Sequence, residues 1–449
     1  MSGAPEGPGA VAGCGVRRRT FLFASTPITA HTINPLPVAA RLTGRGHRVL
    51  WYAARRFHDR IAAVGAEPYG FTEAREHADL AAAYGGAGSP RAIAGLRQGF
   101  ADQLVGDTAR RVRDLERLAS SVSIDAVLTD AVFVAARLWH ERGGPVWASL
   151  GDGPLTYADV DTPPYGSGLL PMRGREGRRR NRVTSRILRR LIWGPALQRL
   201  ISIRTELGLA PTGRSVVEEA MSPHLHLQAC VPEFEYPRRD LPDRIRFIGA
   251  LRPEPEPDRV LPPWWPEFLA DRRPAVLVSQ GTLRPDLTEL VLPTVAALAG
   301  TGLQVVVTTG AGSVDELVAG LGGRTPDGLR VARWIPYEEV LPRVGAFVTN
   351  GGYIGVTSAL AHGVPLVQIG SSEEKAEIGA RIVWSRVGVR RRWRPSRHRL
   401  RRMVEDALTD PGIRAGVEAM HASFARHDAA GEAADALEQL APSHASQQR

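Results

Sequence analysis

Lysine is almost absent from this chain of 449 residues. Lys375 is the single lysine among 57 basic residues, so arginine carries nearly all of the positive charge behind the formal net charge of +10. A positive surface attracts the phosphates of nucleotides, but it attracts any other polyanion as well. The charge alone therefore selects no class of partner.

Cysteine and long hydrophobic runs are also scarce. Cys14 and Cys230 are too few for a disulfide framework or a structural zinc site, and the apolar surroundings of Cys230 predict a buried thiol. A reducing, cytoplasmic compartment is the simplest interpretation. No run of about 18 apolar residues is present, so no membrane-spanning helix is expected. Arg18-Arg19 resembles a twin-arginine export signal, but the apolar stretch that follows, Phe21–Ala24, is too short and is better explained as a first core strand.

The common glycine motifs of nucleotide-binding enzymes are missing. The first predicted strand is followed by Thr-Pro-Ile-Thr-Ala-His, which lacks the glycines of a nicotinamide-binding turn. Gly310 and Gly312 follow another predicted strand, but Asp315 stands where a third glycine is needed, and no Walker sequence is present. These absences count against a dehydrogenase and against a P-loop enzyme.

The sequence does contain a repeated alternation of predicted strands and helices, which is typical of parallel sheets with right-handed crossovers. In the first half we predict strands at 20–25, 47–53, 124–129 and 146–150, and helices at 35–45, 57–64, 92–121 and 131–142. In the second half we predict strands at 275–279, 304–309, 330–334, 346–349 and 365–369, and helices at 288–300, 314–321, 355–362, 375–387 and from 397 to 440.

A proline-rich segment at 251–266 separates the two halves and predicts a stiff linker. We therefore predict an α/β protein with two doubly wound, Rossmann-like domains that face a central cleft. The expected parts are a flexible tail at 1–16, an N-terminal domain at 17–250, the linker, and a C-terminal domain at 267–449 whose last helix could pack back on the first domain. A ligand of such sheets binds at the carboxyl ends of the strands.

The segment 173–204 is strongly basic. It holds eleven arginines and one acidic residue, Glu176, together with apolar residues at helical spacing. Such a helix could lie on a membrane surface or bind an acidic partner. We favour an amphipathic helix that packs on its domain and leaves its arginines in solvent. Nucleic-acid binding is disfavoured because Trp193 is the only aromatic residue among these arginines.

A glycine-rich turn is the most informative feature of the second half. Asn350-Gly351-Gly352 ends a predicted strand, and a helix begins near Gly355. Glycines let the backbone approach a ligand closely, and the N-terminus of the helix offers free N–H groups and the positive end of its dipole. The turn therefore predicts a diphosphate site, although an ordinary tight strand–helix turn would contain the same residues.

Three further polar segments follow predicted strands of the same domain, where a ligand of the sheet must lie. A glycine loop with hydroxyls suits a phosphate, an indole ring suits a base, and carboxylates suit sugar hydroxyls. The segments are Ser279-Gln280-Gly281-Thr282, Trp334-Ile335-Pro336, and Ser371-Ser372-Glu373-Glu374-Lys375.

Together these segments resemble the nucleotide-binding signature of family 1 glycosyltransferases, which include antibiotic macrolide glycosyltransferases and plant and mammalian glucosyl- and glucuronosyltransferases. Residues 334–375 resemble the signature itself, and 276–282 resemble the family's Val-Ser-x-Gly-Ser/Thr loop. Residues 21–150, with Arg45-Gly46-His47-Arg48-Val49, resemble its first domain. The resemblance covers nearly the whole chain beyond the tail and implies the two-domain GT-B fold.

The resemblance also implies roles for single residues. The base would stack on Trp334, beside Ile335, and the sugar hydroxyls would meet Glu374 and Lys375. The diphosphate would meet Gly281, Thr282, Asn350, Gly351, Gly352, Tyr353 and Gly355. The sequence departs from the family pattern where Asn350 replaces histidine, Lys375 replaces glutamine and Tyr337 replaces glutamine; a subgroup of macrolide-type enzymes has a similar Asn-Gly-Gly-Tyr pattern.

The same resemblance implies a histidine that deprotonates the acceptor hydroxyl and an aspartate that orients it. His31 and Asp130 are the candidates, since they follow the first and a later predicted strand. His31 lies four residues before Pro35 instead of the family's three, so a loop shift of one residue is needed. The alternatives are that His31 is a surface loop residue and that Asp130 is only a helix N-cap.

The implied reaction is an in-line displacement with inversion. A sugar, a deoxysugar or glucose, would move from a TDP- or UDP-sugar to a hydroxyl of a lipophilic small molecule such as a polyketide. The helix N-terminus would take the place of a metal ion, so neither metal nor cofactor is expected; Asp159-Val160-Asp161 has a metal-binding pattern but lies in the first domain. We expect small-molecule partners, no nucleic acid, at most peripheral membrane contact through 173–204, and a monomer or homodimer.

Two other functions remain open. A nucleotide-sugar epimerase or hydrolase would use the same architecture without an acceptor. A catalytically silent relative would bind a glycoside or assist a partner transferase, and the irregular spacing of His31 keeps this alternative open. The acceptor would be selected by the loops at 70–99 and 151–177, whose apolar residues among glycines and prolines predict an adaptable pocket.

Overall fold

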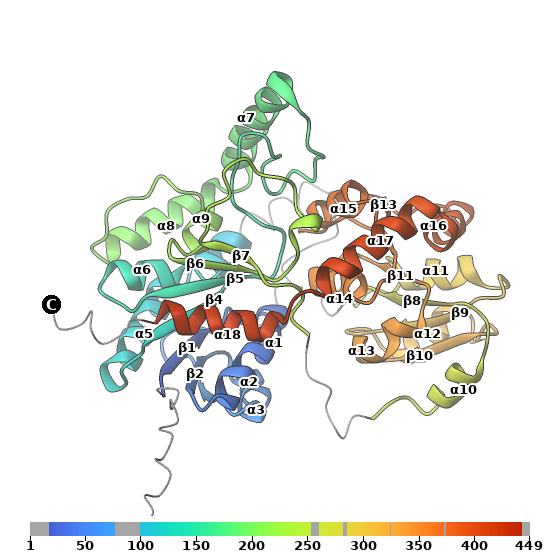
Figure 1. Cartoon of the computed structure of the whole chain (residues 1–449), viewed down its shortest axis with the longest axis horizontal. Helices are drawn as coiled ribbons and strands as arrows, with labels where there is room; N and C mark the ends of the chain where they lie inside the picture. Colours follow the sequence, from blue (N-terminus) through green and yellow to red (C-terminus); the bar gives the residue numbers. More distant parts are fainter. Residues whose placement is uncertain are drawn as a thin grey trace, which may run out of the picture.

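The computed structural model describes residues 18–76, 99–252, 260–281, 285–323, 325–371 and 374–441. Within these ranges the chain forms two sheets, one in each half, and helices flank both sheets (Figure 1). All of the strand pairs are parallel. The predicted α/β class with two doubly wound units is confirmed.

The first sheet has seven strands in the order β3-β2-β1-β4-β5-β6-β7. The order reverses between β1 and β4, which makes the carboxyl ends of these strands the expected ligand site. The strands are β1 Thr20–Ala24, β2 Arg48–Tyr52, β3 Glu67–Tyr69, β4 Ala126–Asp130, β5 Trp147–Gly151, β6 Leu225–Gln228 and β7 Ile245–Phe247. The helices are α1 Thr29–Ile33, α2 Leu36–Gly44, α3 His58–Ala63, η3 Phe100–Val105, α5 Thr108–Ser121, α6 Ala135–Glu141, α7 Gly174–Leu191, α8 Gly194–Glu206 and α9 Val216–Ala220, with short turns η1 Arg55–Phe57 and η4 Pro232–Phe234.

The second sheet has six strands in the order β10-β9-β8-β11-β12-β13, with the reversal between β8 and β11. Its central strands are continuous apolar runs, as expected for strands covered on both faces. The strands are β8 Ala275–Ser279, β9 Gln304–Thr308, β10 Leu329–Ala332, β11 Ala346–Thr349, β12 Leu366–Ile369 and β13 Gly388–Arg391. The helices are α10 Trp265–Ala270, α11 Val291–Leu298, α12 Val314–Gly320, α13 Tyr337–Val340, α14 Tyr353–Ala361, α15 Lys375–Trp384, α16 Arg397–Thr409, α17 Pro411–Phe424 and α18 Ala429–Leu440, with the short turn η5 Leu341–Arg343.

Several predicted helices differ from the observed ones; the helix expected at 131–142, for example, begins only at Ala135. The helix expected at 92–121 is interrupted, because η3 ends at Val105 and α5 begins at Thr108; residues 92–98 lie outside the described part of the chain. The helix expected at 288–300 begins only at Val291. The helical region after 397 forms three helices, because Pro411 has no N–H with which to continue α16 and Asp410 instead caps α17.

The last helix, α18, leaves the second half and lies against the first sheet (Figure 1). Ala433, Ala434 and Leu437 of α18 are fully buried in the core of the first half. Arg45, at the end of α2, forms ion pairs with Glu438 and Asp435 of α18. The C-terminal segment therefore crosses back and ties the two halves together.

The basic segment forms two helices that differ in burial. In α8, Ala196, Leu200 and Ile203 are buried in the core. In α7, only Gly177 and Asn181 are buried, and the helix projects from the body of the protein (Figure 1). The predicted packed amphipathic helix is thus realised by α8, whereas α7 packs mainly through Gly177 and Asn181 and leaves Val183, Ile187 and Leu191 about half exposed.

Candidate functional site

His31 lies in α1, directly after β1, and its imidazole is held by an aspartate. Its Nδ1 lies 2.5 Å from Oδ2 of Asp152, the residue that follows β5. The Asp152 side chain is 2% exposed, whereas that of His31 is 20% exposed. Asp152 thus holds Nδ1, and no hydrogen bond within the described residues engages Nε2 of His31.

The predicted partner of His31, Asp130, has a different task, and the predicted pair is corrected. Asp130 accepts hydrogen bonds from the Thr26 backbone N–H at 2.5 Å, the Thr26 hydroxyl at 3.1 Å and the Val132 N–H at 2.9 Å. These bonds tie the turn after β1 to the end of β4. Asp130 is also not the N-cap of α6, which begins at Ala135. It therefore supports the loop that carries His31 instead of orienting the imidazole.

The surroundings of His31 favour its charged form. Burial works to lower its pKa, but the charge and hydrogen bond of Asp152 and the charges of Asp130 and Glu374 outweigh it and raise the pKa to about 9. The raised pKa favours the imidazolium at pH 7, so His31 must lose this proton before it can act as a base. Since the folded pKa lies above that of a free histidine, the His31–Asp152 pair stabilises the fold at lower pH, and this contribution is lost as the pH rises through about 9.

The glycine-rich turn after β11 lies beside the loop after β8. The Asn350 side-chain amide donates to the backbone carbonyl of Gln280, so the two loops are joined directly. Gly351 has a φ of +96°, and a Cβ there would lie 3.0 Å from Cγ of Gln368. A side chain at this position would therefore be strained. Gly281 faces Asn350 across the same gap, whereas Thr282 lies outside the described residues.

Gln368, near the end of β12, received no role from the sequence. Its amide nitrogen donates to the carbonyls of Asn350, at 3.0 Å, and Gly370, at 2.9 Å. Gln368 is fully buried and links the turn after β11 to the loop after β12. A glutamine inside an otherwise apolar strand was the available signal, because buried amides are retained where they have partners.

Helix α14 begins at this turn. Its N-cap is Gly352, which has no side chain to cap the helix, so the N–H groups of the first turn find no acceptor within the helix. The side chain of Tyr353 leaves the turn: its hydroxyl accepts a 3.0 Å hydrogen bond from Gln228 of β6. Of Tyr353, only the backbone is therefore left to serve the diphosphate site that the sequence predicts. Gly355 is buried against Tyr337, whose hydroxyl a Cβ at Gly355 would approach to 3.1 Å.

The residues expected around the base and the sugar differ in exposure. Trp334 is 59% exposed, with its ring centroid 6.5 Å from that of Tyr337, so its face is open to stacking. Ile335 is 1% exposed and packs in the core of the second half, so only its backbone can meet a base. Glu374 is the N-cap of α15, and Lys375 is the buried first residue of that helix.

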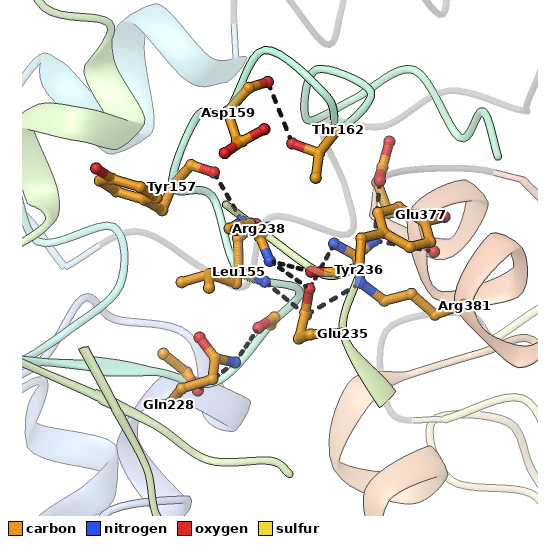
Figure 2. Close-up of polar contacts among 12 residues, drawn as sticks. Leu155, Tyr157, Asp159, Thr162, Gln228, Glu235, Tyr236, Arg238, Glu377 and Arg381 are labelled. Carbon is orange, nitrogen blue, oxygen red and sulfur yellow. Dashed lines mark hydrogen bonds and ion pairs between the residues drawn. The ribbon is translucent and has the colours of Figure 1, made fainter. Parts of the chain in front are cut away.

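A buried ion-pair network joins the two halves beside the cleft, and sequence reasoning missed it (Figure 2). Arg381 of α15 donates to both carboxylate oxygens of Glu235, at 3.0 and 2.9 Å, and to Glu377 at 3.0 Å. Burial raises the pKa of Glu235, but Arg381 and Arg238 outweigh it and hold that pKa below its usual range. The two partners lie 146 residues apart, so no local pattern could have revealed the pair.

The same network holds the predicted acceptor loop. Glu235 accepts from the Leu155 N–H at 2.9 Å, and Glu377 accepts from the Gly168 N–H at 2.5 Å. Arg238 donates to the carbonyls of Leu155 and Tyr157 (Figure 2). Segment 151–177 is therefore fixed to α15, next to Glu374. In the loop at 70–99, residues 77–98 lie outside the described part of the chain.

The aspartates at 159 and 161 are occupied by protein contacts. Asp161 forms ion pairs with Arg178, at 2.6 Å, and Arg239, at 3.3 Å. Asp159 accepts from the backbone N–H groups of Asp161 and Arg239. The pair braces the start of α7 and does not face the cleft residues.

Comparisons with known proteins agree with this geometry. Residues 293–440 match the family model of the C-terminal domain of erythromycin biosynthesis protein CIII-like proteins. The chain is 36% identical over 433 residues to 4'-demethylrebeccamycin synthase of Lentzea aerocolonigenes, a match that covers 93% of this chain and 99% of that protein.

Solved structures share the fold. The glycotransferase of kitacinnamycin has a TM-score of 0.71 at 19% identity and covers 95% of this chain and 100% of its own. The glycosyltransferase VinC, solved in complex with dTDP, has a TM-score of 0.67 at 20% identity and covers 94% of this chain and 100% of its own. From these matches and its two parallel sheets, the protein belongs to the antibiotic-type family 1 glycosyltransferases of the GT-B fold.

Proposed function

We propose that the protein transfers a sugar, a deoxysugar or glucose, from a TDP- or UDP-sugar to a hydroxyl of a lipophilic natural product such as a polyketide, with inversion at the anomeric carbon. The observation that carries this proposal is the placement of His31 and Glu374, which follow strands of different sheets. They belong to different halves of the chain, yet Glu374 is near enough for its charge to raise the pKa of His31. The proposed base and the proposed sugar-binding carboxylate therefore come from both halves to one region of the protein.

In the proposed reaction the acceptor oxygen attacks the anomeric carbon, and His31 Nε2 takes the hydroxyl proton. The bond from that carbon to the diphosphate breaks, and the electron pair leaves with the diphosphate. The free N–H groups and dipole of α14 at Gly352 stabilise the charge that develops there. The step as written needs neither a metal ion nor a cofactor.

Two further observations support the choice of substrates. VinC, which has the same fold, was solved with dTDP, and this favours a thymidine diphosphate donor here. The relative named 4'-demethylrebeccamycin synthase favours a natural-product acceptor. Cys230 is a buried free thiol, which fits the reducing cytoplasm in which we place the enzyme.

The donor site predicts a specific response to one substitution. We expect thymidine or uridine diphosphate, but not guanosine or adenosine diphosphate, to raise the melting temperature. At a ligand concentration of a hundred times the dissociation constant, the free energy of unfolding should rise by about 2.7 kcal/mol. In Gly352→Asp this gain should vanish, because the carboxylate repels the diphosphate, while the unliganded protein keeps its stability, since aspartate is a good N-cap.

The matched controls separate charge from size. Gly352 has a φ of −63° and open space around its Cβ position, so Gly352→Ala should fold normally and keep the nucleotide response. Gly352→Asn caps the helix without adding a charge, so its response to the nucleotide should lie between those of Gly352→Ala and Gly352→Asp. If Gly352→Asp still responds to the diphosphate as the native chain does, the phosphate does not bind at α14.

The His31–Asp152 pair predicts the pH dependence of transfer. We expect kcat/KM to rise with pH along a limb with an apparent pKa of about 9, because the free enzyme must lose the imidazolium proton before His31 can act as a base. Asp152→Asn removes the charge that contributes most to the raised pKa of His31, so the rising limb of the pH profile should move to lower pH. Its plateau should fall, because Nδ1 is no longer oriented.

Asp435→Asn, at the surface pair with Arg45, is the control for a generic loss of charge. It should leave the limb in place. A limb that stays at the same pH in Asp152→Asn would show that another group titrates.

A further inference from the structure

Helix α7 combines a dense positive charge with exposed apolar side chains. Its 18 residues, Gly174–Leu191, include eight arginines and one acidic residue. Val183, Ile187 and Leu191 are exposed by 46, 49 and 57%. They are spaced four apart and therefore form one stripe along the helix. Stripes of this kind are normally buried against a core.

The buried residues Gly177 and Asn181 mark the side of α7 that packs on the protein, and a Cβ at Gly177 would collide with the Met172 carbonyl oxygen. At about 100° per residue, Val183, Ile187 and Leu191 lie roughly 160°, 120° and 80° around the helix from Asn181, and most of the arginines lie on the side opposite Asn181. The apolar stripe therefore runs along one flank of α7, between the packed side and the arginine-rich side. No hydrogen bond within the described chain engages the side chains of Arg182 and Arg186, and both are exposed.

The loop beneath α7 extends the apolar surface. Asn181 donates to the Val160 carbonyl at 3.2 Å, and Arg180 donates to the Leu170 carbonyl at 2.8 Å. Val160 and Leu170 are themselves 62 and 42% exposed. Five of the eleven large apolar side chains that are exposed in the described chain thus gather at this one projection, which argues against chance exposure.

We propose that α7 binds the surface of an anionic lipid bilayer, lying in the headgroup plane with its apolar stripe inserted. A bilayer offers negative headgroups and an apolar interior at the depth of one helix radius, and it matches both features at once. The phosphates of a nucleic acid would pair with the arginines, but the apolar stripe of α7 would remain exposed to water. An acidic protein would have to carry an apolar groove between its acidic residues.

Binding of a bilayer at α7 would also bear on acceptor entry, an inference that rests on the proposed function. The loop 153–173 runs from the Asp152 side of the cleft, contacts α15 at Gly168, and continues into α7. A bilayer bound at α7 would therefore lie near the entrance of the proposed acceptor pocket, where a lipophilic acceptor dissolved in the membrane could enter. Vesicle binding by α7 itself does not depend on this reaction.

The test is sedimentation of the full chain with vesicles of phosphatidylcholine, alone or mixed with phosphatidylglycerol. We expect binding to the mixed vesicles about tenfold or more tighter than to phosphatidylcholine alone, weakened by salt. Arg182→Glu/Arg186→Glu should abolish it. Arg399→Glu/Arg402→Glu, the same charge change on exposed residues of α16, should leave it nearly intact.

A second, uncharged variant tests insertion. Ile187→Ser/Leu191→Ser keeps every arginine, and we expect it to weaken vesicle binding about tenfold or more. All four positions on α7 are exposed, so the melting temperature of these variants should match that of the native chain. Three outcomes would overturn the proposal: no binding of the native chain to mixed vesicles, equal losses in the α7 and α16 variants, or undiminished binding in the serine variant, which would indicate a general polyanion site.

Discussion

Replacing His31 by alanine is expected to lower kcat for sugar transfer by a factor of about 10² to 10⁴, the usual contribution of a positioned general base. The thermal response to thymidine or uridine diphosphate should be unchanged, because the donor phosphates are expected to bind at α14, in the other half of the chain. Transfer rate and nucleotide response are measured on the same preparation. This split distinguishes a transferase base from a residue that only shapes the donor site.

Two companion variants make the result decisive. His224, just before β6, lies at the amino end of its strand, away from the cleft, so His224→Ala should retain full activity. In the background of His31→Ala, Asp152→Asn should cost little more, because Asp152 acts through the imidazole. Full activity in His31→Ala would remove the base assignment and favour the silent-homologue or donor-processing alternatives.

Replacing Arg381 by methionine is expected to lower the free energy of unfolding by about 3 to 5 kcal/mol, the usual cost of removing one partner from a buried ion pair. Arg381 is 2% exposed, and its loss leaves the carboxylates of Glu235 and Glu377 without their shared cation. Arg238 remains beside Glu235 and recovers part of the loss. Urea unfolding of the native and variant chains measures the difference.

The structure offers a matched control for this variant. Arg426 and Glu233 also join the two halves at 3.0 Å, but their side chains are 62 and 49% exposed. Arg426→Met should therefore cost at most about 1 kcal/mol. If the two substitutions cost the same, the buried network does not hold the halves together. Arg381→Met should also weaken acceptor binding more than donor binding, since Glu235 and Glu377 fix the acceptor loop at Leu155 and Gly168.

Local chemistry determined the strands and the glycine-rich turn. Apolar runs such as Phe21–Ala24 and Val276–Val278 are buried strands, because a continuous apolar run bounded by turns is stable only when both of its faces are covered. The positive φ of Gly351 and the start of α14 next to it follow from the same local rules. Short strands such as β3, β7 and β13 were not predicted, because three or four residues are too few to show a periodic pattern.

The pairing of polar groups was decided by the tertiary structure. Asp130 is the last residue of β4 and Asp152 directly follows β5, and their distances along the chain could not show which one contacts His31. The Asp130 carboxylate accepts hydrogen bonds from the N–H groups of Thr26 and Val132, whereas Asp152, 121 residues from His31, hydrogen-bonds to the imidazole. Each carboxylate has few acceptor positions, and packing decides which donors reach them.

By itself, the sequence determined two Rossmann-like units, the glycine-rich turn before α14 and an arginine-rich helical segment, because each depends on residues close together in the chain. Only the tertiary structure decided that Gln228 meets Tyr353, that Arg381 meets Glu235, and that the apolar stripe of α7 stays uncovered. Contacts between distant residues depend on how the two sheets and the returning helix α18 fit together. Burial and hydrogen bonding of those surfaces are properties of the whole fold and not of any local pattern.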